Sequence, residues 1–182
     1  MAAYDRTIYH PVNIPIPGEK EKPAPLTVRN TVQVNEASFT FTLQDIKHLY
    51  TGEVSSPRCL ISNLTWRLEV SITRRLPGMT SQEPYLSLFL RCENEKPSTM
   101  QWSCTGAYVL TLVNQKNKRK SIKCRGEVTF GPSISSSVYD SWGSPRMIQW
   151  SKFTDPKKGF LQGNVAVFRA RIRNLSPIME RD

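Results

Sequence analysis

Cysteine and histidine are the residues of this 182-residue chain that could most directly support covalent chemistry. They occur at six positions: Cys59, Cys92, Cys104, Cys124, His10 and His48. A cysteine nucleophile needs a histidine held beside it to take up its proton. His10 lies in a proline-rich segment, and His48 falls on a predicted short helix that would expose it, so neither is placed to act as that base. The chain also lacks a G-x-S-x-G elbow and a phosphate-binding glycine loop, and we expect no catalytic site and no enzyme activity.

The spacing of the same residues argues against a metal site. No two cysteines form a C-x-x-C pair, and histidine, aspartate and glutamate do not gather at ligand spacings. Each cysteine is surrounded by apolar residues, which is typical of a buried thiol that packs as a small hydrophobic group. We therefore expect free thiols, no metal and no cofactor.

Basic residues are in excess, with 25 lysines and arginines against 15 acidic residues and a formal charge of +10. Six of them crowd one predicted hairpin: Lys116, Lys118, Arg119, Lys120, Lys123 and Arg125. Such a cluster could neutralise phosphates, which leaves a nucleic-acid-binding module as an alternative function. The cluster lacks the interleaved aromatic residues that stack on bases, and lysine commonly protects a strand edge. The pattern therefore favours a solvated hairpin tip over a nucleic-acid site.

The segment Asp140-Ser141-Trp142-Gly143-Ser144 indicates a third kind of chemistry, the capture of an extended peptide. At the edge of a sheet, such a segment could accept a partner's backbone as an added strand. Trp142 would supply a broad apolar surface with one N–H donor, and Gly143 would let a partner's backbone come close. The sequence alone leaves two alternatives open for Trp142, a core position and an exposed position in a groove.

The two ends of the chain differ in composition from the region between them. Residues 1–34 contain five prolines and the charged run 19–22, so we expect a disordered N-terminal arm. Residues 177–182 are expected to form a short tail, which leaves 35–176 as one domain. No run approaches the ~20 apolar residues that span a bilayer, and the first residues lack the apolar stretch of a signal peptide. We expect a soluble intracellular protein that does not contact a membrane.

Period-two alternation of apolar and polar residues dominates the chain from Ala37 onward, as is typical of strands that are buried on one face. The clearest strand is the last one, in which one face carries Ala166, Phe168, Ala170 and Ile172. Similar patterns predict strands over 38–41, 66–73, 86–90, 102–113 and 121–130. Between the first two, Thr42 as an N-cap and apolar residues at helical spacing predict one short helix that ends near Tyr50. The whole pattern predicts an all-β fold, an antiparallel β-sandwich.

Turn signals are densest over residues 150–160. Trp150 reads as the end of an apolar strand, and Asp155-Pro156 then starts a turn, because proline presets φ and the aspartate side chain can accept a backbone N–H beyond it. Gly159 supplies the backbone freedom that the exit from the turn needs. Eight residues before Trp150 stands the Trp142-Gly143 pair.

These motifs resemble the end of a TRAF-like (MATH) domain, which reads Trp-Gly, Trp-Ser, Thr-Asp-Pro and Lys-Gly-Phe in the same order. The resemblance is closest to the N-terminal substrate-recruiting domain of the herpesvirus-associated ubiquitin-specific protease. It spans about Phe39 to Arg173 and also covers Cys59, Asn63-Leu64, Trp66, Phe89-Leu90-Arg91-Cys92 and Trp102-Ser103-Cys104.

The resemblance implies a sandwich that recruits partners in the ubiquitin pathway, in the nucleus and cytoplasm, by binding short Pro/Ala/Glu-x-x-Ser motifs. It implies that Trp142 contacts the peptide, with Asp140, Ser141, Gly143 and Ser144 along the same edge. The family has an aspartate directly before that tryptophan, where this chain has Ser141, and a phenylalanine where it has Ser144.

Three further points follow from the resemblance. An arginine that helps to select peptides in the family aligns with Thr73, so Arg74 and Arg75 are candidates for its role. In the resembled deubiquitinase the catalytic boxes lie in a separate domain, so the chain could be an N-terminal piece of such a cysteine protease, with a role in deubiquitination. TRAF proteins trimerise through a coiled coil, and because this sequence has no sustained heptad we expect a monomer.

Overall fold

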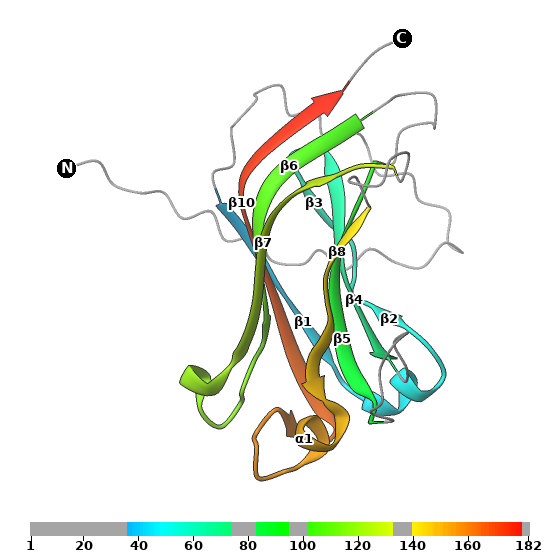
Figure 1. The fold of residues 1–182 in the computed structure, drawn as a ribbon, viewed down its shortest axis with the longest axis vertical. Coiled ribbons are helices and arrows are strands. Elements are labelled where there is room, and N and C mark those ends of the chain that lie inside the picture. Colours follow the sequence, from blue (N-terminus) through cyan, green and yellow to red (C-terminus); the bar gives the residue numbers. More distant parts are fainter. Residues whose placement is uncertain (1–35, 74–82, 95–101, 133–139, 180–182) are drawn as a thin grey trace, which may run out of the picture.

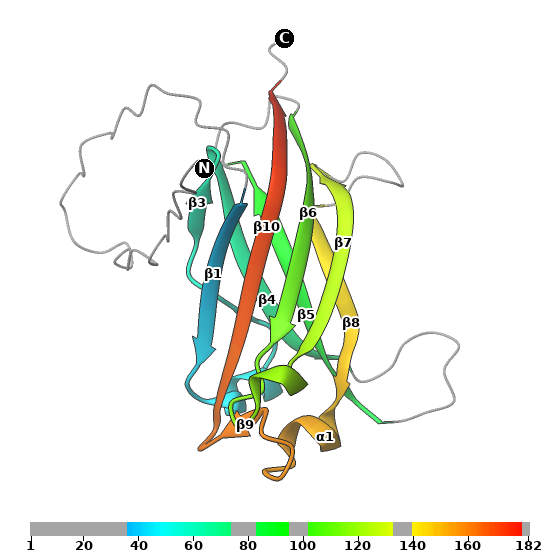
Figure 2. The same ribbon diagram turned by 90° about the vertical axis from the view of Figure 1, so that its left-hand side faces the viewer.

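The chain folds into two antiparallel β-sheets that face each other (Figures 1 and 2). The structure is a computed structural model that describes residues 36–73, 83–94, 102–132 and 140–179. The predicted all-β sandwich is confirmed over these residues. The expected arm, residues 1–34, lies outside the described residues, as do Arg74 and Arg75.

The first sheet has the strand order β1-β10-β6-β7, and every neighbouring pair is antiparallel. Its strands are β1 (Glu36–Leu43), β10 (Val165–Met179), β6 (Trp102–Leu112) and β7 (Ile122–Phe130), with β9 (Leu161–Gln162) pairing the start of β10. The predicted hairpin between β6 and β7 is present, with Leu112 opposite Ile122. β10 continues beyond residue 176, the expected end of the domain, and pairs there with the start of β6.

The second sheet has the strand order β2-β4-β5-β8 and is also antiparallel. Its strands are β2 (Val54–Ser55), β4 (Leu64–Thr73), β5 (Tyr85–Glu93) and β8 (Ser141–Gln149), with β3 (Cys59–Ile61) pairing the start of β4. Strand β8 therefore stands at one end of the sheet. It begins within the segment 140–144, for which the sequence predicts peptide capture.

The core forms where the apolar faces of the two sheets meet. In β10 the predicted face is buried, and in β1 every second residue from Ala37 to Leu43 is buried as well. Trp66 of β4 and Phe130 of β7 meet edge to face between the sheets, with ring centroids 4.9 Å apart. An aromatic pair in this geometry contributes about 0.5–1.5 kcal/mol beyond the area that it buries.

The short helices differ from the expectation. Thr42 does not cap a helix, because the alternation of β1 continues through Leu43, and Asp45 caps the 3₁₀ helix η1 (Ile46–Tyr50) by accepting the amide of Lys47 at 2.9 Å. A second 3₁₀ helix, η2 (Lys118–Lys120), forms the tip of the β6–β7 hairpin. No helix in the described parts of the chain is long and apolar enough to cross a membrane.

The stretch 150–160 also contains an element that the sequence did not predict. Trp150 is not the end of a strand but the first residue of α1 (Trp150–Thr154), the α-helix of the described residues. The turn after it is confirmed: Asp155 Oδ1 accepts the amide of Lys157 at 2.8 Å, and Gly159 has a φ of 82°.

This turn is fixed to the β6–β7 hairpin through Asn114, which is only 1% exposed. The Asn114 side-chain amide donates to the carbonyl of Lys158 at 2.6 Å, and its Oδ1 accepts the amides of Lys116 and Asn117. Gln115 adds side-chain bonds to the carbonyls of Phe160 and Val165. The turn is thus held at the end of the sandwich where α1 lies (Figure 1).

Candidate functional site

The segment 140–144 lies at the terminal strand of the second sheet. β8 pairs with β5 and is the last strand of that path among the described residues. The carbonyl of Asp140 accepts the amide of Cys92 at 2.8 Å, which fixes where the β5–β8 ladder begins. Figure 2 shows β8 beside β7, the terminal strand of the first sheet. We call the side of β8 that faces away from β5 the open edge.

The side chain of Trp142 lies at the boundary between core and surface. Trp142 pairs with Leu90, which is fully buried, so both side chains lie on the inner face of the sheet. The indole packs against the core but stays partly exposed, and its Nε1 donates to the carbonyl of Thr129 in β7 at 3.2 Å. The indole thus joins the terminal strands of the two sheets. Its contact with a peptide stays a prediction.

Gly143 stands where β8 leaves no room for a side chain beside β5. A Cβ atom built on Gly143 would stand 2.1 Å from the carbonyl oxygen of Leu88 and 2.6 Å from the Cα of Phe89. Contacts this short do not occur, so any side chain would push the two strands apart. Position 143 must therefore lack a side chain so that β5 of the same chain can pack against it. The sequence instead predicts a glycine that makes room for a partner's backbone.

Asp140 and Ser141 lie beside a chain of charged residues on the outer face of the second sheet. Ser141 pairs with Arg91, whose guanidinium forms ion pairs with Asp140 and with Glu69 of β4. Glu69 is 3% exposed and also pairs with Arg67 at 3.3 Å. A buried carboxylate is stable only when it is paired in this way. Asp140 is therefore engaged by a residue of its own chain.

Ser144 is the last residue of the regular ladder. Ser144 pairs with Leu88 but Ile148 pairs with Leu86, so residues 145–147 lie opposite Ser87 alone. The irregularity contains Pro145, which has no amide to donate and is tolerated on a terminal strand. The Ser144 hydroxyl accepts the amide of Arg146 at 3.3 Å. Regular pairing at the open edge is thereby limited to residues 141–144.

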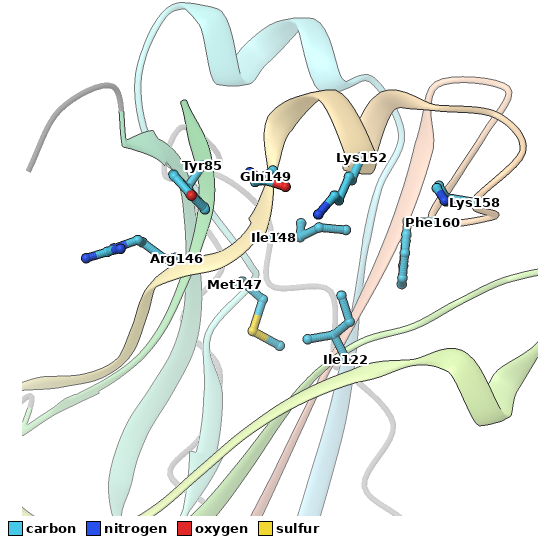
Figure 3. A pocket seen from close by; sticks show the side chains of 9 residues that line it. All are labelled: Tyr85, Ile122, Arg146, Met147, Ile148, Gln149, Lys152, Lys158 and Phe160. Atoms are coloured by element: carbon cyan, nitrogen blue, oxygen red, sulfur yellow. The ribbon is translucent and has the colours of Figure 1, made fainter. Parts of the chain in front are cut away.

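An open pocket with a volume of about 530 Å³ lies beyond this irregularity, at the α1 end of β8 (Figure 3). Apolar side chains line part of it: Ile122 of β7, Met147 and Ile148 of β8, and Phe160. The other lining residues are polar, basic or aromatic: Tyr85, Arg146, Gln149, Lys152 and Lys158. Figure 3 shows Ile122 facing Met147 and Ile148, with Lys152 beside Ile148 and Lys158 beside Phe160.

Sequence reasoning did not select the residues of this pocket. The useful signal is Pro145, because proline within a strand pattern marks a terminal strand or a bulge. The pocket is assembled from β5, β7, β8, α1 and the turn at Phe160, and no spacing within the sequence reveals that these segments meet.

The other candidates for chemistry are far less organised. Cys92 and Cys104 are buried, and burial raises the pKa of the Cys104 thiol to about 11. His48 is exposed on η1. The described residues contain no group of three side chains able to hold a metal ion. The basic residues of η2 are exposed at the hairpin tip, and Lys116 donates to the carbonyl of Pro156 at 2.7 Å.

Comparison with known proteins agrees with this architecture. A model of the MATH domain family matches residues 38–172. Two MATH domain and coiled-coil domain-containing proteins of Arabidopsis thaliana are similar to the chain: one is 27% identical over 79% of this chain, the other 22% identical over 82% of it. The matches cover 41% and 49% of those proteins, so the chain spans less than half the length of each.

These comparisons test the resemblance to MATH domains that the sequence motifs indicated. They confirm the MATH domain but give no support to a closer relation with the deubiquitinase. MATH domains are generally protein-interaction modules and are mainly non-catalytic. With the sandwich formed over the matched residues, this chain belongs to the MATH domain family.

Proposed function

We propose that this MATH domain captures short extended segments of partner proteins by adding them as a strand to the open edge of β8. The observation that carries the proposal is the place of β8 at the end of its sheet. A terminal strand offers backbone donors and acceptors that a peptide can pair with.

The backbone groups that serve this pairing follow from the ladder. Asp140 bonds to Cys92 of β5, and in an antiparallel ladder the bonding direction alternates from one residue to the next. Counting in twos, Trp142 and Ser144 direct their backbone groups toward β5, and Ser141 and Gly143 direct theirs to the open edge. Pro145 ends this short pairing segment.

Side chains near the edge would then set the preference for particular peptides. The Pro/Ala/Glu-x-x-Ser motif remains our proposal for the ligand, with the peptide serine near Ser141. Asp140 contributes less than an unpaired carboxylate would, because its charge is engaged by Arg91. A hydroxyl partner at Ser141 would bind a peptide serine less tightly than a charged acceptor would.

The test uses peptides selected from a random library on the full chain. One selected peptide is then synthesised with a single backbone N-methyl group at each successive position. Strand addition needs every second peptide amide, so we expect affinity to fall more than tenfold at alternate positions and to change little at those between. Amide shifts in NMR spectra should centre on residues 141–144. A uniform or patternless loss would contradict strand addition.

The wider role that we propose is recruitment of partners in the ubiquitin pathway, by a monomeric domain without catalytic function that works in the nucleus and cytoplasm. Support comes from the Trp-Gly, Trp-Ser and Thr-Asp-Pro motifs. Proximity labelling in cells, with a variant that fails the peptide test as control, should recover ubiquitin ligases, deubiquitinases or their substrates only with the binding-competent chain. Equal recovery by both chains would contradict this role.

A further inference from the structure

We propose that the pocket at the α1 end of β8 binds an acidic segment of a partner protein around one bulky apolar side chain. The inference rests on the proposed function, because it names the chemical class of the segment that β8 captures. It is carried by the apolar floor of the pocket, by its basic rim and by its continuity with the open edge.

The floor of the pocket is suited to one apolar side chain. Met147, Ile148 and Phe160 are buried except for the small surface that they turn toward the pocket, and Ile122 closes the opposite wall. Pockets that take small ligands measure about 300–1,000 Å³. The volume of about 530 Å³ therefore accommodates a leucine or phenylalanine together with part of its backbone.

The rim of the pocket is positively charged. Arg146, Lys152 and Lys158 line it, all three are exposed, and none forms an ion pair within the described parts of the chain. The Arg146 guanidinium lies over the Tyr85 ring, 5.8 Å from its centroid, and a guanidinium stacked in this way keeps its N–H edge available for a carboxylate.

Two acidic side chains close to this rim are already engaged, and the first of them is Asp155, which accepts the amide of Lys157 at 2.8 Å. Glu83 accepts hydrogen bonds from the Gln149 side chain at 2.9 Å and from the Ser151 hydroxyl. Three cations around an apolar floor complement a ligand that carries carboxylates on both sides of an apolar residue.

The pocket continues directly from the open edge. Residue 144 ends the pairing segment, and residue 148 lines the pocket on the same strand. An extended chain rises about 3.3 Å per residue, so a bound peptide reaches the pocket roughly four residues from its paired segment. In an antiparallel arrangement the acidic part precedes the paired segment, and in a parallel one it follows.

The test uses three capped pentapeptides, titrated into the isotope-labelled full chain and followed by NMR. They are Glu-Asp-Leu-Asp-Glu, the neutral Gln-Asn-Leu-Asn-Gln and the anchorless Glu-Asp-Ala-Asp-Glu. We expect the first to shift the amides of Met147, Ile148, Lys152 and Phe160, and the other two to bind at least about tenfold more weakly. The affinity of Glu-Asp-Leu-Asp-Glu should fall as salt is raised, because salt screens the exposed charges.

Two double variants then test the rim. Lys152→Gln with Lys158→Gln should weaken the acidic peptide about three- to tenfold, as expected for the loss of two exposed charge contacts, and leave the neutral one unchanged. Lys118→Gln with Lys120→Gln makes the same change of charge on exposed η2 and should have little effect. An equal loss in both variants would show that the peptide is held by the overall positive charge and not by the pocket, and it would overturn the proposal.

Two other results would also overturn it: no shifts at the pocket, or equal binding of the alanine peptide. The outcome is separable from that of the proposed function. The pentapeptides are too short to fill the pocket and pair with residues 141–144 together. Failure of strand addition would therefore leave their binding intact, and failure of the pocket would leave the alternating N-methyl pattern intact.

Discussion

Gly143 is the position of β8 at which an added side chain should cost the most. Gly143→Ala would place a methyl group 2.1 Å from the carbonyl of Leu88, so β8 must move away from β5. We expect unfolding in urea to require about 1–3 kcal/mol less free energy, the usual cost of overpacking, with loss of peptide binding.

Gly163→Ala is the matched control for this prediction. A methyl group on Gly163 would have nothing within 4 Å of it, and the φ of 54° makes the substitution cost only backbone strain, roughly 1–2 kcal/mol. Peptide binding should survive there. If Gly143→Ala keeps full stability and full binding, the close approach of the two strands does not hold in solution.

Trp142 should contribute to stability as well as to any binding. Trp142→Phe keeps most of the ring but removes the N–H that donates to the carbonyl of Thr129. We expect a loss of about 0.5–1.5 kcal/mol in a denaturant melt, the usual contribution of one hydrogen bond. Trp142→Ala should lose more, because the indole packs on the core. A phenylalanine variant as stable as the original would show that the link between the sheets has no energetic value.

At the scale of elements, Asn114 determines where the turn at 155–160 lies. Asn114→Ala removes three hydrogen bonds and leaves the carbonyl of Lys158 and two amides without their partner. We expect a loss of about 2–4 kcal/mol, since each of the three hydrogen bonds contributes about 0.5–1.5 kcal/mol.

The same substitution should also weaken the acidic pentapeptide, because Lys158 and Phe160 stand on the displaced turn. Ser38→Ala, on the exposed face of β1, is a control that should change neither property. A variant that is destabilised but binds the pentapeptide normally would place the turn outside the binding surface.

Glu53, the residue directly before β2, should give the stability a pH dependence. Partial burial raises the pKa of Glu53, nearby Glu69 raises it further, and Arg91 and Arg67 offset part of the effect. The native state therefore holds this proton more tightly than the unfolded state does, and the stability gained is present at acid pH and lost as pH rises through the raised pKa.

Glu53→Gln should accordingly stabilise the protein at pH 7 and give no gain at a pH below about 4, where the carboxyl is protonated in both states. The measurement is the difference in unfolding free energy between the two proteins across that range. A difference that does not vary with pH would show that Glu53 does not titrate with folding.

Which elements the sequence could predict depends on how far each pattern extends. The alternation in β10 continues over many residues, and its buried face was identified correctly. Helix α1 spans five residues, so Trp150 and Phe153 give a single helical spacing that resembles the end of a strand. At the other end of the domain, Thr42 had the chemistry of an N-cap, but the apolar positions of β1 continued through Leu43 and Asp45 supplied the cap.

At the scale of the whole molecule, the thiols should report how often the sandwich opens. Cys92 and Cys104 are buried between the sheets, and their pKa values are raised by the loss of solvent. Because the thiolate is the reactive form, we expect both to resist alkylation at pH 8 until the fold opens. Partly exposed Cys124 and Cys59 should react first.

Mass spectrometry of alkylated peptides over time measures the order of reaction directly. In strong denaturant all four cysteines should react at similar rates, which is the control for their intrinsic reactivity. Equally fast labelling of Cys104 in native buffer would mean that the sheets separate far more readily than their packing indicates.

The arrangement of the strands is what the sequence could not supply. A period of two shows that a strand is half buried, but it does not name the neighbouring strand or the end of the sheet. The segment 140–144 was found through its tryptophan and glycine. The pocket was missed because its walls come from distant segments, and the inward direction of Trp142 depends on its pairing with Leu90.

The close contact at Gly143 has a consequence for how such domains can diverge. Gly143 is required because the backbone of β5 leaves no room for a side chain, and Trp142 links β8 to β7 through a hydrogen bond. Both residues therefore serve the fold, whatever the domain binds. Ser141 and Ser144 on either side carry no comparable demand. A lineage can therefore inherit the Trp-Gly pair unchanged while its neighbours drift toward a new ligand, and two chains that share the pair need not share a partner.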